Sequence, residues 1–434
     1  MKTKYLKLNL ISEFCLLHLF LFPIESQAYL DPGTGSMLLS VFIGMTSALY
    51  FGIRNIPSLM RKVVFKLSKN EIAEEASIVF YSESKNYWLT FKPVLESLVR
   101  TNSNIIYLTS DEEEIKTAKK SFPSLNIKFI GIGNKAFTKL NFLKCDVLVL
   151  TTPGLDVLQI KRSKGVGTYV HIVHSLSDIH GYKLFSFDYY DVIIASGQSQ
   201  KMSLLDLEKI RNQKKKTIIE LGCPYLDTFY ERAQLINNKI RNKVIIFAPT
   251  WGKNSFLYKL SPSVFNSVSR LGYKIIFRPH PQSRISDKKI LSTWLTELQK
   301  IPGSYYDQNP DGFETLSKAS ILISDLSGVV FDFAFIFKKP VITLGDGFKK
   351  EGFEAWDLSR PAWEVQAYQI IGRRMNSYSI NELINKIKEV EDVSHYSIKN
   401  VEELIKTEAV NLGTSGPKIA EYLASLTTKN KLNS

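Results

Sequence analysis

Cysteine, histidine and acidic residues are scarce in this sequence. Its 434 residues include three cysteines, Cys15, Cys145 and Cys223, and six histidines. Because the cysteines lie far apart and form no Cys-x-x-Cys pair, the sequence supports neither a disulfide framework nor a zinc site, and a reducing compartment fits best. The 42 acidic residues are outnumbered by 56 basic ones, which gives a net charge of +14. That imbalance favours an anionic partner: nucleic acid, an anionic membrane surface or a phosphorylated substrate.

Several nucleotide-binding and metal-binding signatures are also missing. The chain has no Gly-x-x-x-x-Gly-Lys-[Ser/Thr] loop and no Gly-x-Gly-x-x-Gly fingerprint, so it is neither an ordinary ATPase nor a typical NAD enzyme. No cluster of Asp and Glu demands a metal, and we expect no cofactor, although metal dependence stays open. The basic residues are scattered and no arginine-rich recognition motif occurs, which disfavours a nucleic-acid partner.

Two apolar segments near the N-terminus predict a membrane protein. Residues 1–28 contain an apolar stretch that ends in small residues, typical of a cleaved signal peptide or of a first membrane segment. Residues 36–53 are uncharged and would span about 27 Å as a helix, enough to cross the hydrocarbon core, although a buried core helix is the alternative. The basic residues that follow place the rest of the chain in the cytoplasm: Arg54, Arg61, Lys62 and Lys66. We therefore expect a single-pass or hairpin anchor in the cell membrane.

From residue 75 onward the chain alternates short apolar runs with amphipathic stretches, which predicts parallel sheets wrapped by helices. The strands are expected at 77–82, 104–110, 126–132, 146–152, 168–174, 191–197, 217–222, 243–251, 274–281, 319–325 and 339–346. We expect a Rossmann-like doubly wound domain over 75–235, a second one over 240–395, and terminal helices over 396–434. Ligands bind beyond the carboxyl ends of the strands in such α/β sheets. The residues directly after each predicted strand are therefore the candidate functional residues.

The first polar strand end is "HIVHSLSDIH", residues 171–180. His171 and His174 are three residues apart, which places them on opposite faces of a strand and disfavours a shared metal. His174 lies nearer the carboxyl end and can act as a general base near neutral pH. The alternative is a hydrogen-bonded core histidine.

Three further strand ends carry polar groups. In "APTW", Thr250 and Trp251 form a turn, and the indole could stack on a base or serve the fold. In "RPHP", Arg278 and His280 alternate with prolines on a rigid extended stretch and suit phosphate oxygens. In "SDLSG", a strand meets a helix whose N-terminus favours an anion; the polar and small residues there are Ser324, Asp325, Ser327 and Gly328. Asp332, one turn further, is expected to hold the loop or an arginine.

Taken in order, His174, "APTW", "RPHP", "SDLSG" and "KKPVI" (338–342) resemble the CDP-glycerol glycerophosphotransferase family of teichoic acid and capsule synthesis. The resemblance covers roughly residues 145–350 and implies a GT-B-like fold, in which two Rossmann-like domains face each other across a cleft. It implies transfer of a polyol phosphate from a CDP-activated donor to a hydroxyl of a lipid-linked or glycan acceptor, with release of CMP. The first domain would take the acceptor and the second the donor.

The resemblance also assigns roles to residues. It makes His174 the general base and His280 a contact of the donor phosphates, with Ser324, Asp325, Ser327 and Gly328 as the donor loop. Ser175 stands where the family has a glycine, and Gly328 where it has a serine. Two rivals stay open. One is a GT-B glycosyltransferase or epimerase that uses a nucleotide sugar, because these enzymes share a nucleotide-diphosphate cleft on the same fold. The other is a nucleotide-binding relative without activity, which the missing glycine after His174 favours.

Overall fold

The structure is a computed structural model and describes residue 45 and residues 76–101, 104–236, 243–309, 311–325, 327–345, 350–391 and 397–432. The predicted segments 1–28 and 36–53 lie outside the described residues, apart from Met45. Within the described ranges, no helix is both long and apolar enough to cross a membrane.

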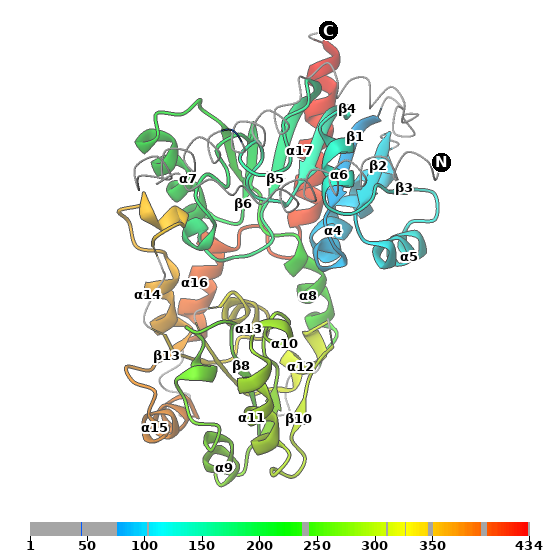
Figure 1. Cartoon of the computed structure of the whole chain (residues 1–434). Coiled ribbons are helices and arrows are strands. Elements are labelled where there is room, and N and C mark those ends of the chain that lie inside the picture. Colours follow the sequence, from blue (N-terminus) through cyan, green and yellow to red (C-terminus); the bar gives the residue numbers. More distant parts are fainter. Residues whose placement is uncertain are drawn as a thin grey trace, which may run out of the picture. The chain divides into compact units, whose positions relative to one another are not determined.

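The first sheet has seven parallel strands in the order β3-β2-β1-β4-β5-β6-β7 (Figure 1). The strands are β1 Ala76–Ser82, β2 Ile105–Thr109, β3 Asn126–Phe129, β4 Lys144–Leu150, β5 Gly165–Ile172, β6 Val192–Ala195 and β7 Thr217–Glu220. Its central strands are buried almost throughout, as expected of apolar strands covered on both faces. The alternating pattern therefore located all seven strands.

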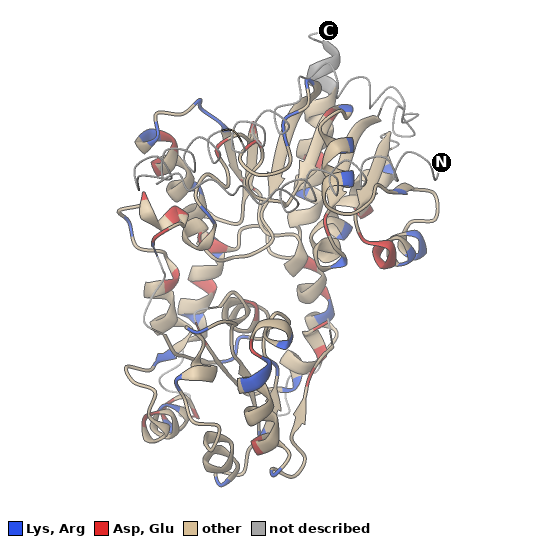
Figure 2. Ribbon diagram, in the orientation of Figure 1, with Lys and Arg blue, Asp and Glu red and all other residues tan. Residues whose placement is uncertain are grey.

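The helices of this sheet are α4 Trp88–Leu98, α5 Glu112–Ser121, α6 Asn134–Leu140, α7 Gln198–Ile210 and α8 Tyr225–Gln234. The Asp111 side chain caps α5, whose first turn is acidic and whose last turn is basic, as the helix dipole favours (Figure 2). The last helix, α17 Ser415–Leu432, packs against α4 and β4 (Figure 1). The end of the chain thus returns to the first sheet.

The second sheet has six parallel strands in the order β10-β9-β8-β11-β12-β13. They are β8 Val244–Ala248, β9 Lys274–Phe277, β10 Tyr305–Tyr306, β11 Ile321–Ser324, β12 Val341–Thr343 and β13 Gly372–Arg374. Its helices are α9 Val264–Ser269, α10 Ser283–Ser286, α11 Lys288–Leu298, α12 Phe313–Lys318, α13 Val329–Phe337, α14 Glu364–Ile370, α15 Ile380–Glu391 and α16 Ile398–Glu408. The sequence pattern missed β10, because two residues are too few to show a period, and β13, because Gly-Arg-Arg contains no apolar residue.

Polar contacts join the helices of the second sheet to those of the first. The backbone N–H of Asp178 donates to Glu364 on α14 at 2.7 Å. The phenol of Tyr225 on α8 donates to the buried carboxylate of Asp332 on α13. Asp332 therefore binds a tyrosine of the other sheet's helices, and the expectation that it holds an arginine is wrong.

Burial raises the pKa of Asp332 to about 7, and the hydrogen bond from Tyr225 opposes this only in part. The folded state thus binds the proton of the Asp332 carboxyl more tightly than the unfolded state does. The free energy of unfolding is therefore highest, as far as Asp332 determines it, below about pH 4, and it falls as the pH rises through about 7. We predict that Asp332→Asn, which stays neutral and can still accept from Tyr225, gains up to about 4 kcal/mol of unfolding free energy over wild type between those pH values. Urea unfolding of both proteins at several pH values measures this difference; parallel pH curves would contradict the assignment.

Candidate functional site

A pocket of ≈ 140 Å³ lies at the carboxyl ends of β8, β9 and β11. It brings together three of the predicted residues, Arg278, His280 and Ser327. Two cationic or proton-donating side chains and the start of α13 thus line one cavity, and phosphate oxygens match such donors. Arg284, Asp307 and Asn309 also line it.

Arg278 is held in place by two acceptors that also line the pocket. Its Nη1 donates to the backbone oxygen of Asn309 at 2.8 Å and to the carboxylate of Asp307. Gly312 lies directly against the guanidinium, since a Cβ there would come within 2.9 Å of Nη2. Arg278 is therefore positioned before any ligand arrives, and its charge is partly balanced by Asp307.

His280 is an exposed hydrogen-bond donor in the same pocket. Its Nδ1 accepts from the backbone N–H of Gln282 at 3.1 Å, which leaves the proton of the neutral ring on Nε2. Although the residue is exposed, protein atoms cover part of the ring, and this partial burial lowers its pKa, so the neutral form dominates at pH 7. Trp251, half exposed, lies with its ring 6.4 Å from that of His280. An exposed indole beside the pocket can stack on a base.

Ser324 and Asp325 do not line the pocket and hold the fold instead. The hydroxyl of the fully buried Ser324 donates to the backbone oxygen of Ala248 at 2.6 Å and so ties β11 to β8. Asp325, also buried, accepts from the backbone N–H groups of Thr250 and Phe256 at 2.8 and 2.9 Å. Their side chains therefore fix the turn that carries Thr250 and Trp251, and the expected contact of this pair with a ligand stays a prediction.

His174 lies beyond the end of β5 among aromatic rings. Tyr87 and Tyr182 pack against it edge-on, with ring centres 5.1 and 5.9 Å away. Its Nδ1 is buried without a hydrogen-bond partner, and burial lowers the pKa of the imidazole to about 4. His174 is thus not the hydrogen-bonded core histidine of the alternative interpretation. His171 is fully buried with neither ring nitrogen bonded, which suits a packing role.

The loop after His174 contacts the "SDLSG" loop of the second sheet. A Cβ on Gly328 would lie 3.0 Å from the hydroxyl of Ser175 and 3.4 Å from that of Ser177. Gln200, buried and missed by the sequence analysis, holds the Ser175 loop by donating to the backbone oxygens of Ser175 and Ser177 at 3.0 and 2.7 Å. The two departures from the family pattern, Ser175 and Gly328, therefore face each other and fit sterically as a pair.

Sequence reasoning also missed the residues that support Arg278. Asp307 and Asn309 follow β10, a strand too short to be recognised, so no strand end pointed to them. The only signal in the sequence is the turn-forming run "DQNPDG" at 307–312.

The fold and the pocket define a GT-B-like protein with two parallel α/β sheets. Residues 182–402, just over half of the chain, match the model of the CDP-Glycerol:Poly(glycerophosphate) glycerophosphotransferase family. The chain belongs to this family.

Two curated relatives come from Bacillus spizizenii. A teichoic acid poly(glycerol phosphate) polymerase is 33% identical over 148 residues, which is 30% of this chain and 35% of the polymerase. A teichoic acid glycerol-phosphate primase is 22% identical over 279 residues, 57% of this chain and 68% of the primase. The match thus spans about a third of the polymerase and about two thirds of the primase.

Solved structures show the same fold at low identity. The wall teichoic acid polymerase TagF aligns with a TM-score of 0.54 and 16% identity over 89% of this chain and 98% of that one. A UDP-GlcNAc 2-epimerase from Methanocaldococcus jannaschii aligns with a TM-score of 0.54 and 16% identity over 81% of this chain and all of the other. At such identities the likeness establishes the fold alone.

We predict that Gly328→Ser destabilises the chain by about 1–3 kcal/mol, as overpacking does, and that Ser175→Gly removes most of that cost. Gly328 has an ordinary backbone conformation, so the cost is steric. The Ser175 hydroxyl cannot move away freely, because it accepts from the backbone N–H of Ser177 at 3.1 Å. Denaturant unfolding of the two single variants and the double variant gives the coupling energy. Strictly additive effects would show that the two positions do not meet.

Proposed function

We propose that this chain transfers glycerol phosphate, or a similar polyol phosphate, from a CDP-activated donor to a hydroxyl of a lipid-linked or glycan acceptor and releases CMP. The proposal rests on one observation above all: Arg278, His280 and Ser327 line a single pocket at the strand ends of the second sheet. Family membership supports a CDP-linked donor for that pocket.

The reaction forms one bond and breaks one. The acceptor oxygen attacks the phosphorus that carries the glycerol, and the bond from that phosphorus to the bridging oxygen breaks. CMP leaves with the bridging oxygen and its charge. Arg278 and the Nε2–H of His280 would stabilise this charge, and donors aimed at developing charge commonly supply the largest part of catalysis.

We assign the proton of the acceptor hydroxyl to His174. The lowered pKa keeps His174 neutral, and hence able to accept a proton, throughout the physiological range. The diphosphate of a bound donor would raise this pKa, because a nearby negative charge favours the protonated ring. The ring would therefore become a stronger base once the donor is in place.

We further propose that residues 36–53 anchor the chain in the cell membrane with the described residues on the cytoplasmic side. The basic residues that follow this apolar segment support the orientation. An anchor would hold the site close to a lipid-linked acceptor, which raises the effective concentration of that acceptor.

One prediction concerns the donor. The assay measures nucleotide release by the full chain in detergent, with a panel of CDP-alcohols and UDP-sugars and a lipid-linked acceptor. We expect CMP release that falls about 10²- to 10⁴-fold in His174→Ala, the usual loss for a positioned general base. Arg278→Ala should weaken CDP binding as well, whereas Arg270→Ala, an exposed arginine of the same sheet's helices, should leave CMP release unchanged.

Other outcomes of this panel decide between the rivals. UDP release alone would identify a nucleotide-sugar enzyme, and tight CDP binding without turnover would identify an inactive relative. CMP release that is unchanged in His174→Ala would remove His174 from the mechanism.

A second prediction concerns how kcat/KM falls on the acidic side of its pH profile. Activity requires neutral His174, and burial lowers its pKa to about 4, so kcat/KM should stay nearly constant down to about pH 5 and fall through about pH 4. An ordinary histidine would produce the fall near pH 6.5. Rates measured from pH 4 to pH 8, with circular dichroism at each pH to confirm folding, test this. A limb near 6.5 would contradict a desolvated His174 as the base.

A further inference from the structure

A second pocket of ≈ 140 Å³ opens at the strand ends of the first sheet. Its walls include the carboxylate of Glu83 and the polar side chains of Thr152 and Gln159, with Phe137 and Leu158 among the apolar ones. None of the predicted site residues lines this pocket.

The topology places this pocket beside His174. Glu83 directly follows β1 and Thr152 follows β4, while His174 follows β5. The strands β1, β4 and β5 are adjacent and parallel, and their register aligns Tyr81 with Leu150 and Leu150 with His171. Two strand spacings separate the ends of β1 and β5, so Glu83 and His174 lie roughly 10 Å apart across the sheet. Tyr87, which follows Glu83 closely in the sequence, also packs its ring against His174.

The charges of the two pockets differ in sign. Arg278 and Arg284 line the pocket of the second sheet, which suits phosphate. The lining of the Glu83 pocket contains one carboxylate and neither Lys nor Arg. A phosphate would be repelled there, whereas an ionised carboxylate accepts hydrogen bonds from hydroxyl groups.

The walls also suit the carbon atoms of a polyol or sugar. Leu158 is 47% exposed at the pocket and presents an apolar side chain next to Phe137. A neutral, polyhydroxylated ligand offers C–H groups to such a wall and hydroxyl groups to Glu83, Thr152 and Gln159. Sites of this kind combine an apolar lining with a few polar groups that fix the orientation of the ligand.

We propose that the Glu83 pocket binds the neutral, hydroxyl-bearing end of the acceptor. This inference rests on the proposed function and identifies its acceptor subsite as one for an uncharged polyol or sugar terminus. Glu83 accepts hydrogen bonds from hydroxyl groups of the bound terminus, while the reacting hydroxyl extends toward His174. The phosphate of the donor stays in the cationic pocket of the second sheet.

The test measures binding without turnover, with the full chain in detergent and without donor. The probes are glycerol and, as the anionic comparison, glycerol 3-phosphate, and saturation-transfer NMR reports their affinities. We expect Glu83→Gln and Leu158→Ser each to weaken glycerol binding by about tenfold, the effect of one charge-assisted hydrogen bond or one apolar contact. Glu112→Gln, the same chemical change at an exposed position of α5, is the matched control.

The second part of the test measures steady-state kinetics with the lipid-linked acceptor. In both pocket variants the KM for the acceptor should rise by a similar factor while the KM for the donor stays constant. Leu158 is exposed, so Leu158→Ser keeps the test valid if Glu83→Gln fails to fold.

The inference is overturned if glycerol does not bind, if it binds equally to wild type and both pocket variants, or if binding of glycerol 3-phosphate shows the same dependence on Glu83. A rise in the donor KM alone would also overturn it. A chain that releases no CMP would refute the proposed function, and the glycerol measurement would still decide whether the pocket binds a neutral polyol.

Discussion

The parallel direction of every strand is the constraint on which the site depends. In a parallel sheet all carboxyl ends lie at one edge, so the residues that follow the strands gather there whatever their distance in sequence. In the second sheet, His280 follows β9 and Ser327 follows β11, although the two residues lie far apart in sequence. The same constraint brings Glu83 and Thr152 into one pocket. Function is therefore distributed over loops, and the buried strands determine where each loop begins.

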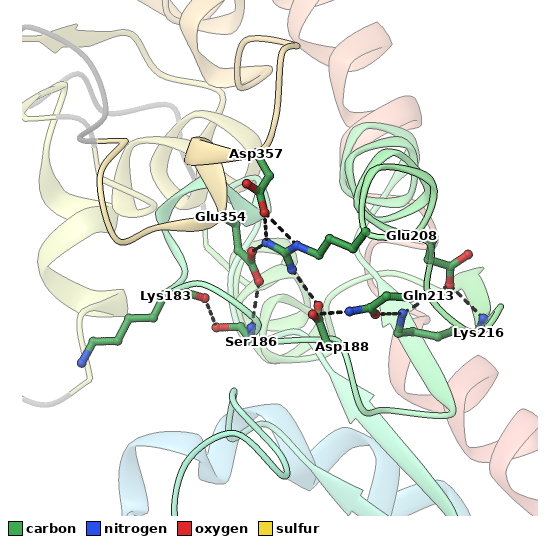
Figure 3. A network of polar contacts seen from close by, with 9 residues as sticks. Lys183, Ser186, Asp188, Glu208, Gln213, Lys216, Glu354 and Asp357 are labelled. Atoms are coloured by element: carbon green, nitrogen blue, oxygen red, sulfur yellow. Dashed lines mark hydrogen bonds and ion pairs between the residues drawn. The ribbon is translucent and has the colours of Figure 1, made fainter.

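Polar contacts also hold the two sheets together. One polar contact is formed by Arg211 at the end of α7, which donates to Asp188 at 2.7 Å and binds Glu354 and Asp357 from the segment after β12 (Figure 3). Burial raises the pKa of Glu354, and the guanidinium opposes that rise. An unpaired buried charge is costly, so loss of Arg211 would leave Glu354 and Asp188 uncompensated. This network thus stabilises the contact between the two sheets.

Sequence reasoning located the strands of the site but not the direction of their side chains. Long apolar runs such as β1 and β4 are recognisable without a structure, whereas β10 is too short and β13 has no apolar residue. A strand-end pattern cannot tell a side chain that enters the pocket from one that turns back into the core. Ser327 enters the pocket, while Ser324, three residues earlier, bonds to Ala248. Glu83 carries no motif, so only the fold reveals its pocket.

The net charge and the charge of the donor pocket are separate properties. Arg278 in the pocket is paired with Asp307, so the local positive charge is smaller than the number of basic groups suggests. The excess of +14 is distributed over many elements of both sheets (Figure 2). Such a dispersed charge attracts a large anionic surface or polymer over long distances but does not orient a ligand. Orientation comes instead from short-range donors, Arg278 and His280, whose positions are fixed by Asn309 and Gln282 before a ligand binds. The overall charge therefore affects how often an anion approaches, whereas these few fixed groups can orient it in the pocket.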